Sequence, residues 1–206
     1  QMCIRDSSKG TKLEIPILFG AFYGMRRSET LGMKWDAIDF ERDTITIRHT
    51  LTTVALDGKR ITVAEDRTKN KSSMRTLPLV PFVKERLLEL KAEQEENRRL
   101  CGRSYVKDYT GYVCINEIGD IIKPNYVSCG FPKLLEEHGL RRVRYHDLRH
   151  SCASLLLANG VPMKQIQEWL GHSDFSTTAN IYAHLDYSSK LTSADAMLNG
   201  LGFAQN

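Results

Sequence analysis

Apolar side chains dominate the first part of the chain and recur with helical spacing after residue 80. Residues 11–23 (TKLEIPILFGAFY) are largely apolar and predict a buried helix that Gly24 ends. Pro81 suits the first position of a long helix, where a missing backbone N–H has no cost. A short helix is expected at residues 26–35. Further helices are expected at residues 81–100, 124–138, 146–158, 162–170, 174–184 and 187–199.

The period changes between the first helices and Pro81. Residues 44–49 and 59–64 alternate apolar and polar side chains, as half-buried strands do. Asp57-Gly58 between them is typical of a hairpin turn, and residues 74–80 predict a third strand. A short strand is also expected at 112–115. The fold class is therefore α+β: mainly helical, with a small three-stranded antiparallel sheet.

Length and composition fit one globular domain. The chain has 206 residues, 41% of them hydrophobic and 26% charged, which is enough to bury a core. Residues 1–10 show no periodicity, so we expect a ragged segment outside the fold and a single domain over 11–206. The five cysteines have no paired spacing, and no stretch approaches the roughly 20 apolar residues of a membrane span. We expect a cytoplasmic protein without disulfides.

The charge pattern permits nucleic acid as a partner. The net charge is +4 and the isoelectric point is near 8.8. Residues 141–150 (RRVRYHDLRH) hold four arginines and two histidines, and residues 67–75 (RTKNKSSMR) hold four cations and no acid. Such runs are usually only solvated faces. These two differ in that each also contains one of the motifs below.

Four short pieces of sequence carry candidate chemistry. Each alone has an ordinary explanation: a surface arginine, a solvated loop, a helix-capping histidine or a core tyrosine. In this order and spacing they resemble the tyrosine recombinase (phage integrase) family, and the resemblance runs from about residue 12 to residue 198. The pieces are Gly24-Met-Arg26-Arg-Ser-Glu29, Thr68-Lys69-Asn-Lys71, His146-Asp-Leu-Arg149, and Leu170-Gly-His172 followed by Thr177-Thr178 and Tyr182-Ala-His184.

The resemblance implies a role for each matched residue. Arg26 and Arg149 would hold the non-bridging oxygens of a scissile DNA phosphate, since arginine donates paired hydrogen bonds and stays charged. Tyr182 would be the nucleophile. The resemblance implies His146 and His172 as general base and hydrogen-bond donor, without deciding which is which. Lys69 would protonate the leaving 5′-oxygen, and the reaction would need neither ATP nor a metal or other cofactor.

Two of these assignments have a competitor nearby. Lys71 lies two residues from Lys69, on the same side of an extended loop. Similarity to T-K-x-K-S-S hairpins in integrases of conjugative transposons and phages favours Lys69. Tyr187 is the alternative nucleophile, but the T-T-x-x-x-Y-x-H context marks Tyr182. Glu29 is expected to be structural. Additional DNA contacts are predicted at Lys71, Arg75, Arg144, His150 and Thr177.

Two other functions compete with recombination. His146 and His150 share one helical face beside a carboxylate, which imitates a zinc hydrolase site, although no third ligand follows at a usual spacing. The helices expected on either side of Gly160 faintly resemble a helix-turn-helix, which would suit a DNA-binding regulator without catalysis. A regulator would not need Arg26, His172 and Tyr182 together.

The resemblance also implies partners. Family members clasp double-stranded DNA between two domains and assemble as a homo-tetramer on paired sites. By this resemblance we expect residues 11–206 to be the catalytic domain, without the N-terminal core-binding domain. The apolar positions of residues 188–203 fit a helix that packs on its own domain equally well as one that docks on a neighbouring protomer. The resemblance favours an integrase of a bacterial or phage mobile element.

Overall fold

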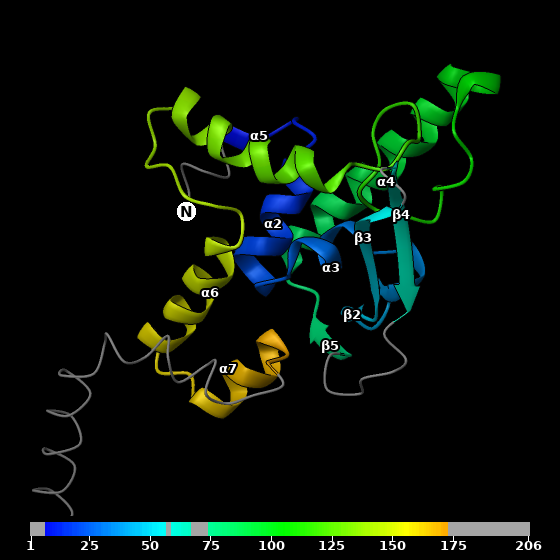
Figure 1. Cartoon of the computed structure of the whole chain (residues 1–206). Helices are drawn as coiled ribbons and strands as arrows, with labels where there is room; N and C mark the ends of the chain where they lie inside the picture. The colour runs from blue at the N-terminus through cyan, green and yellow to red at the C-terminus, as the bar shows by residue number, and fades with distance from the viewer. Residues whose placement is uncertain (1–6, 57–58, 67–73, 173–206) are drawn as a thin grey trace, which may run out of the picture.

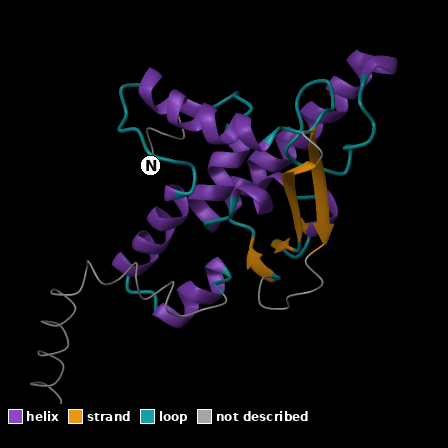
Figure 2. Cartoon of the chain, in the orientation of Figure 1, coloured by secondary structure: helices purple, strands orange, loops and turns teal. Residues whose placement is uncertain are grey.

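The computed structural model describes residues 7–56, 59–66 and 74–172. Figure 1 shows helix α2 in the middle of the domain, with α5 on one side, α6 and α7 on the other, and the strands beside them. Figure 2 shows how far helix predominates over strand. The helices are α2 (Glu14–Tyr23), α3 (Arg27–Leu31), α4 (Pro81–Cys101), α5 (Pro124–Glu137), α6 (Asp147–Ala158) and α7 (Met163–Leu170), with 3-10 turns at Trp35–Ala37 and Gly102–Ser104.

Helix α2 is buried on nearly all sides, as its continuous apolar sequence predicts. Phe19 and Tyr23 are fully buried, and the helix packs against both α3 and α6. It ends at Gly24, whose φ of 57° is the left-handed conformation in which glycine commonly ends helices. A central apolar helix of this kind fixes the positions of the polar groups at its carboxyl end.

The strands form two sheets. One has the order β1-β2-β5, built from Ile38–Asp39, Thr44–Ile47 and Arg75–Pro78, and the other is the hairpin β3-β4, built from His49–Leu56 and Lys59–Asp66. The three-stranded antiparallel sheet is confirmed, but its membership corrects the prediction. Residues 59–64 belong to the β3-β4 hairpin and not to the three-stranded sheet, whose third strand is β1.

Several smaller expectations also change or fall outside the described chain. Residues 112–115 form only isolated bridges, Lys34 with Tyr112 and Ile115 with Ile121, so the strand predicted there is wrong. The serine at position 8 is buried and its carbonyl accepts a hydrogen bond from the backbone N–H of Thr11, so residues 7–10 belong to the fold. The Asp57-Gly58 turn, the predicted helices at 174–184 and 187–199 and the segment 188–203 lie among residues that the structure does not describe.

Helices α6 and α7 form a pair joined by a short turn. Cys152 and Ala153 of α6 pack against Ile166 and Leu170 of α7 in a small buried cluster. The four cysteines within the described ranges are free thiols. Within those same ranges no helix is long and apolar enough to cross a membrane. His146 immediately precedes α6 and His172 lies two residues after α7, so the pair positions both of these predicted site residues.

Tyr145 joins the start of α6 to the centre of the fold. Its hydroxyl donates to the carbonyl of Pro16 over 2.7 Å and lies 2.9 Å from the Thr30 hydroxyl, and the ring is buried. We expect Tyr145→Phe to lower the free energy of unfolding by about 1–3 kcal/mol, because it leaves buried polar partners unsatisfied. Urea denaturation measures this. Tyr126→Phe, at an exposed ring, is the control, and an equal change in both variants would contradict the role given to the hydroxyl.

Candidate active site

Arg149 is a buried guanidinium held by three acceptors. Its Nε donates to Nε2 of His172 over 3.2 Å, Nη1 to the Gly24 carbonyl over 2.6 Å, and Nη2 to the Leu170 carbonyl over 2.7 Å. The residue is only 2% exposed. Burial, followed by the charge of Arg26, lowers the pKa of Arg149 to about 9, so the side chain stays charged at neutral pH.

The two backbone acceptors exist because two helices end beside Arg149. The last carbonyls of a helix have no partner within it, and both α2 and α7 end at a glycine with positive φ, Gly24 and Gly171. A Cβ added to Gly24 would lie 2.3 Å from Cδ2 of Leu170. Glycine is therefore required at position 24 both for the backbone conformation and for the close approach of α7.

Arg26 is oriented by Glu29. As the residue preceding α3, Arg26 donates its backbone N–H to Oε2 of Glu29 over 2.9 Å and its Nη1 to Oε1 over 2.8 Å. Nη2 lies 3.4 Å from the carbonyl of Gly171, at the end of α7. The Arg26 side chain is 32% exposed whereas that of Glu29 is fully buried. The carboxylate thus fixes a guanidinium that remains open to solvent.

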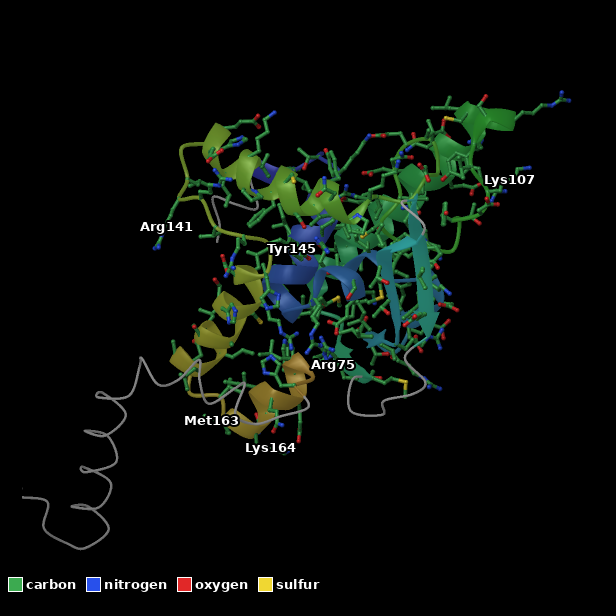
Figure 3. The ribbon with its side chains drawn as sticks, viewed as in Figure 1. Arg75, Lys107, Arg141, Tyr145, Met163 and Lys164 are labelled. Atoms are coloured by element: carbon green, nitrogen blue, oxygen red, sulfur yellow. The ribbon has the colours of Figure 1, made fainter. Side chains whose placement is uncertain are left out.

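A second arginine, Arg75, reaches the same carboxylate. Its Nη2 lies 3.1 Å and its Nη1 3.4 Å from the two oxygens of Glu29, and its Nε donates to the Trp169 carbonyl over 2.8 Å. Figure 3 shows Arg75 where β5 approaches α7. Burial alone would raise the pKa of Glu29, but the charge and hydrogen bonds of Arg75, and then those of Arg26, lower it to about 2. Glu29 is a structural carboxylate, as expected, and is charged at all ordinary pH values.

His172 completes the cluster one residue after Gly171. It is buried, and its pKa is lowered to about 4 by burial, followed by the charges of Arg149 and Arg26. Because Nε2 accepts the hydrogen bond from Arg149, the tautomer that fits carries its proton on Nδ1. At neutral pH His172 is therefore a neutral imidazole that donates from one nitrogen and accepts at the other.

His146 precedes α6 on the exposed side of the cluster. Its ring meets that of His150 edge to face, with centroids 5.2 Å apart. Partial burial, followed by the charges of His150 and Arg149, lowers its pKa. A neutral imidazole near the buried arginines can accept a proton, which is what a general base requires.

The depressed pKa of His172 predicts how stability depends on pH. Between its usual value of 6.5 and about 4, the unfolded chain binds a proton that the folded chain does not. The free energy of unfolding should therefore be fully retained above this window and fall as pH drops through it. Urea denaturation from about pH 7 to about pH 5 measures the slope. His172→Gln keeps an acceptor for Arg149 but does not titrate, so it should reduce the slope, and an unchanged slope would contradict the assignment.

The structure brings some of the predicted residues together and leaves others apart. Arg26, Arg149 and His172 meet at the ends of α2 and α7, with His146 at the edge of the cluster. Arg144 and His150 are at the surface, Arg144 paired with Asp147 over 3.0 Å. The residues that fall outside the described ranges are Lys69, Lys71, Thr177, Tyr182 and the alternative nucleophile Tyr187.

Arg75 corrects one prediction. It was expected to contact DNA, yet its side chain is only 6% exposed and points inward to Glu29. The alternation of β5 contains the signal: Arg75 and Leu77 are two residues apart, face the same side and are both buried. The period of the strand therefore places Arg75 on the buried side, although it also belongs to the basic run at 67–75.

The geometry does not favour the zinc alternative. Among the described residues, no group of three histidine, cysteine, aspartate or glutamate side chains is placed to hold a metal ion. Asp147, the carboxylate next to His146, bonds instead to the backbone and side chain of Arg144. His146 and His150 therefore lack a third ligand within this part of the chain.

Comparison with known proteins defines the class to which this fold and cluster belong. The chain belongs to the phage integrase family, whose sequence model matches residues 4–189. It is 33% identical over 203 residues to a tyrosine recombinase XerC-like protein of Caldanaerobacter subterraneus subsp. tengcongensis, a match that covers 96% of this chain. The chain spans 52% of that relative's length.

Solved structures show the same fold. The Tn1549 transposon integrase in complex with a circular intermediate DNA matches with a TM-score of 0.74 at 19% identity, over 95% of this chain and 63% of that one. The crystal structure of XerA recombinase matches with a TM-score of 0.67 at 18% identity, over 97% of this chain and 61% of that one. The predicted α+β class is confirmed by these matches.

Proposed function

We propose that this chain is the catalytic part of a site-specific DNA recombinase that cuts and rejoins strands through a 3′-phosphotyrosine at Tyr182. The observation that carries the proposal is the cluster of Arg26, Arg149 and His172, two guanidinium groups and one imidazole held together where α2 and α7 end. Membership of the phage integrase family supports it. A regulator that only binds DNA has no need for a buried arginine held this rigidly.

The two arginines would bind the scissile phosphate. A guanidinium has more N–H groups than the three bonds Arg149 makes within the described chain, and the remainder can reach a phosphate oxygen. Arg26 adds a second guanidinium group, which is partly exposed to solvent. Negative charge builds on the non-bridging oxygens as phosphorus becomes five-coordinate, and donors already fixed there stabilise that state without reorganising.

Protons would move between the DNA and Tyr182, His146 and Lys69, while His172 would donate only a hydrogen bond. The Tyr182 hydroxyl gives its proton to His146 as its oxygen bonds to phosphorus, and the bond from phosphorus to the 5′-oxygen breaks. The 5′-oxygen takes a proton from Lys69. His172 acts as a hydrogen-bond donor to the phosphate through Nδ1–H, because Nε2 is occupied by Arg149. Attack by a 5′-hydroxyl of another strand reverses these steps and rejoins DNA without ATP or metal.

We propose double-stranded DNA as the partner and a homo-tetramer on paired sites as the working assembly. The Tn1549 integrase was solved with a circular intermediate DNA, which supports DNA binding. Lys71, Arg144, His150 and Thr177 are candidates to contact the duplex around the cut. Such a protein would act in the cytoplasm, where the DNA of a bacterium or a mobile element is found.

Capture of a covalent protein–DNA adduct tests this function. The chain is incubated at low ionic strength with labelled, nicked duplexes of random sequence, so that a short released strand diffuses away and rejoining is blocked. Detergent and potassium then precipitate only DNA that is bound covalently to protein. We expect labelled DNA in the precipitate, equally with and without EDTA. Cleavage without an adduct, abolished by EDTA and restored by zinc, would instead establish a metal hydrolase.

A further inference from the structure

Arg75 is a buried cation that the proposed reaction does not use. It belongs to β5, which pairs with β2 in the sheet and contacts α7. Its Nε is bound by the carbonyl of Trp169 and its two terminal nitrogens face Glu29. A Cβ added to Gly171 would lie 2.7 Å from Nη1 of Arg75, so the glycine leaves room for this guanidinium. The side chain is therefore held in one place from three sides.

The charges around Glu29 are unequal in their exposure. Glu29 is fully buried, Arg75 is nearly so, and Arg26 is the partly exposed member. Oε1 faces Nη1 of both arginines, while Oε2 faces the backbone N–H of Arg26 and Nη2 of Arg75. One carboxylate charge is thus shared between two guanidinium charges, which leaves a net positive charge at the trio.

We infer that Arg75 is a positioning residue that acts as the counter-charge of Glu29, so that Arg26 keeps its own charge for the DNA phosphate. Without Arg75, the ion pair with Arg26 would carry more of the task of balancing the buried carboxylate. The pair would then be neutral, and the phosphate would lose one of the two positive charges proposed to bind it. The inference rests on the proposed function, because it assumes that Arg26 binds the phosphate.

Paired variants separate this charge role from simple packing. Arg75→Gln removes the counter-charge, and we expect it to slow single-turnover adduct formation at saturating DNA by about ten-fold or more. Adding Glu29→Gln removes the charge that needs balancing but keeps a side-chain oxygen that can accept a hydrogen bond from Arg26, so the double variant should form the adduct faster than Arg75→Gln alone. Arg75→Lys keeps the charge and should lose less rate than Arg75→Gln. If Arg75 only filled space, the second substitution would add damage and the double variant would be as slow or slower.

Salt dependence of DNA binding gives a readout that needs no catalysis. The slope of log affinity against log salt is negative, and its magnitude should fall by about 0.9 in Arg75→Gln, because the phosphate contact of Arg26 is lost. In the double variant the slope should return to the wild-type value, because that contact is regained. A slope unchanged by Arg75→Gln would overturn the inference even if wild-type protein formed no adduct. If wild-type protein forms the adduct but the double variant does not recover, this inference fails and the proposed function stands.

Folding of the variants is followed by thermal melting. Arg75→Gln leaves Glu29 as a less compensated buried charge, which is strongly destabilising. If that variant does not fold, the double variant decides alone, because it lacks the buried Glu29 charge that Arg75 would balance. A folded double variant that forms the adduct within about ten-fold of wild type supports the inference. A folded double variant without activity overturns it.

Discussion

Replacing Tyr182 with phenylalanine is expected to abolish the covalent DNA adduct. The substitution removes one oxygen, the atom proposed to attack phosphorus. DNA affinity should stay near that of wild-type protein, since no charge changes and phosphate contacts dominate binding. Adduct precipitation measures the first quantity, and fluorescence anisotropy with the same duplex measures the second.

Tyr187→Phe is the matched control, since it makes the same change five residues along the chain. It should leave adduct formation close to the wild-type level. The reverse pattern, with adduct lost in Tyr187→Phe and kept in Tyr182→Phe, would assign the nucleophile to Tyr187. Retention of the adduct in a variant that carries both substitutions would remove Tyr182 and Tyr187 alike from the reaction.

Arg149→Ala is expected to slow adduct formation by about 100-fold or more, because a fixed donor to the phosphate is lost. The same change leaves the carbonyls of Gly24 and Leu170 and Nε2 of His172 without their donor, so stability should also fall. Single-turnover kinetics at saturating DNA, well below the melting temperature, separates the chemical effect from unfolding.

Two further variants test why the site needs arginine at this position. Arg149→Lys keeps a charge and three donors, but these lie on a single nitrogen and cannot reach acceptors that the guanidinium bonds from three different nitrogens, so most of the loss should remain. Arg141→Ala removes an exposed charge that extends away from the domain in Figure 3, and it should have little effect on the rate. Equal losses in Arg149→Ala and Arg141→Ala would indicate general electrostatics rather than a fixed phosphate contact.

Helices were the most predictable part of the fold. The sequence predicts the bounds of Pro81–Cys101 and Pro124–Glu137 to within a residue or so, because a proline begins each helix and a glycine follows soon after each one ends. The sheet was less predictable. Arg48 interrupts the expected first strand, so the chain leaves β2 at Ile47 and starts the separate β3–β4 hairpin at His49. Strand β1 has two residues, too few for any alternation to appear.

The site was predictable in its residue types but not in its internal contacts. Arg26, Arg149 and His172 come from short motifs, and the structure brings them together. Two of the three acceptors of Arg149 are backbone carbonyls at helix ends. Every residue has a carbonyl, so only the tertiary approach of α2 and α7 selects Gly24 and Leu170. The burial of Arg75 followed from strand period, a signal that the basic run around it obscured.

Identification of the modified residue tests the central proposal most directly. After the adduct is trapped and the DNA is digested to a short remnant, peptide mass spectrometry locates the residue that carries the nucleotide phosphate. The proposed mechanism predicts that remnant on the peptide containing Tyr182, linked through the tyrosine oxygen to a 3′-phosphate. A remnant on any other residue, or a 5′-phosphate linkage at Tyr182, would contradict it.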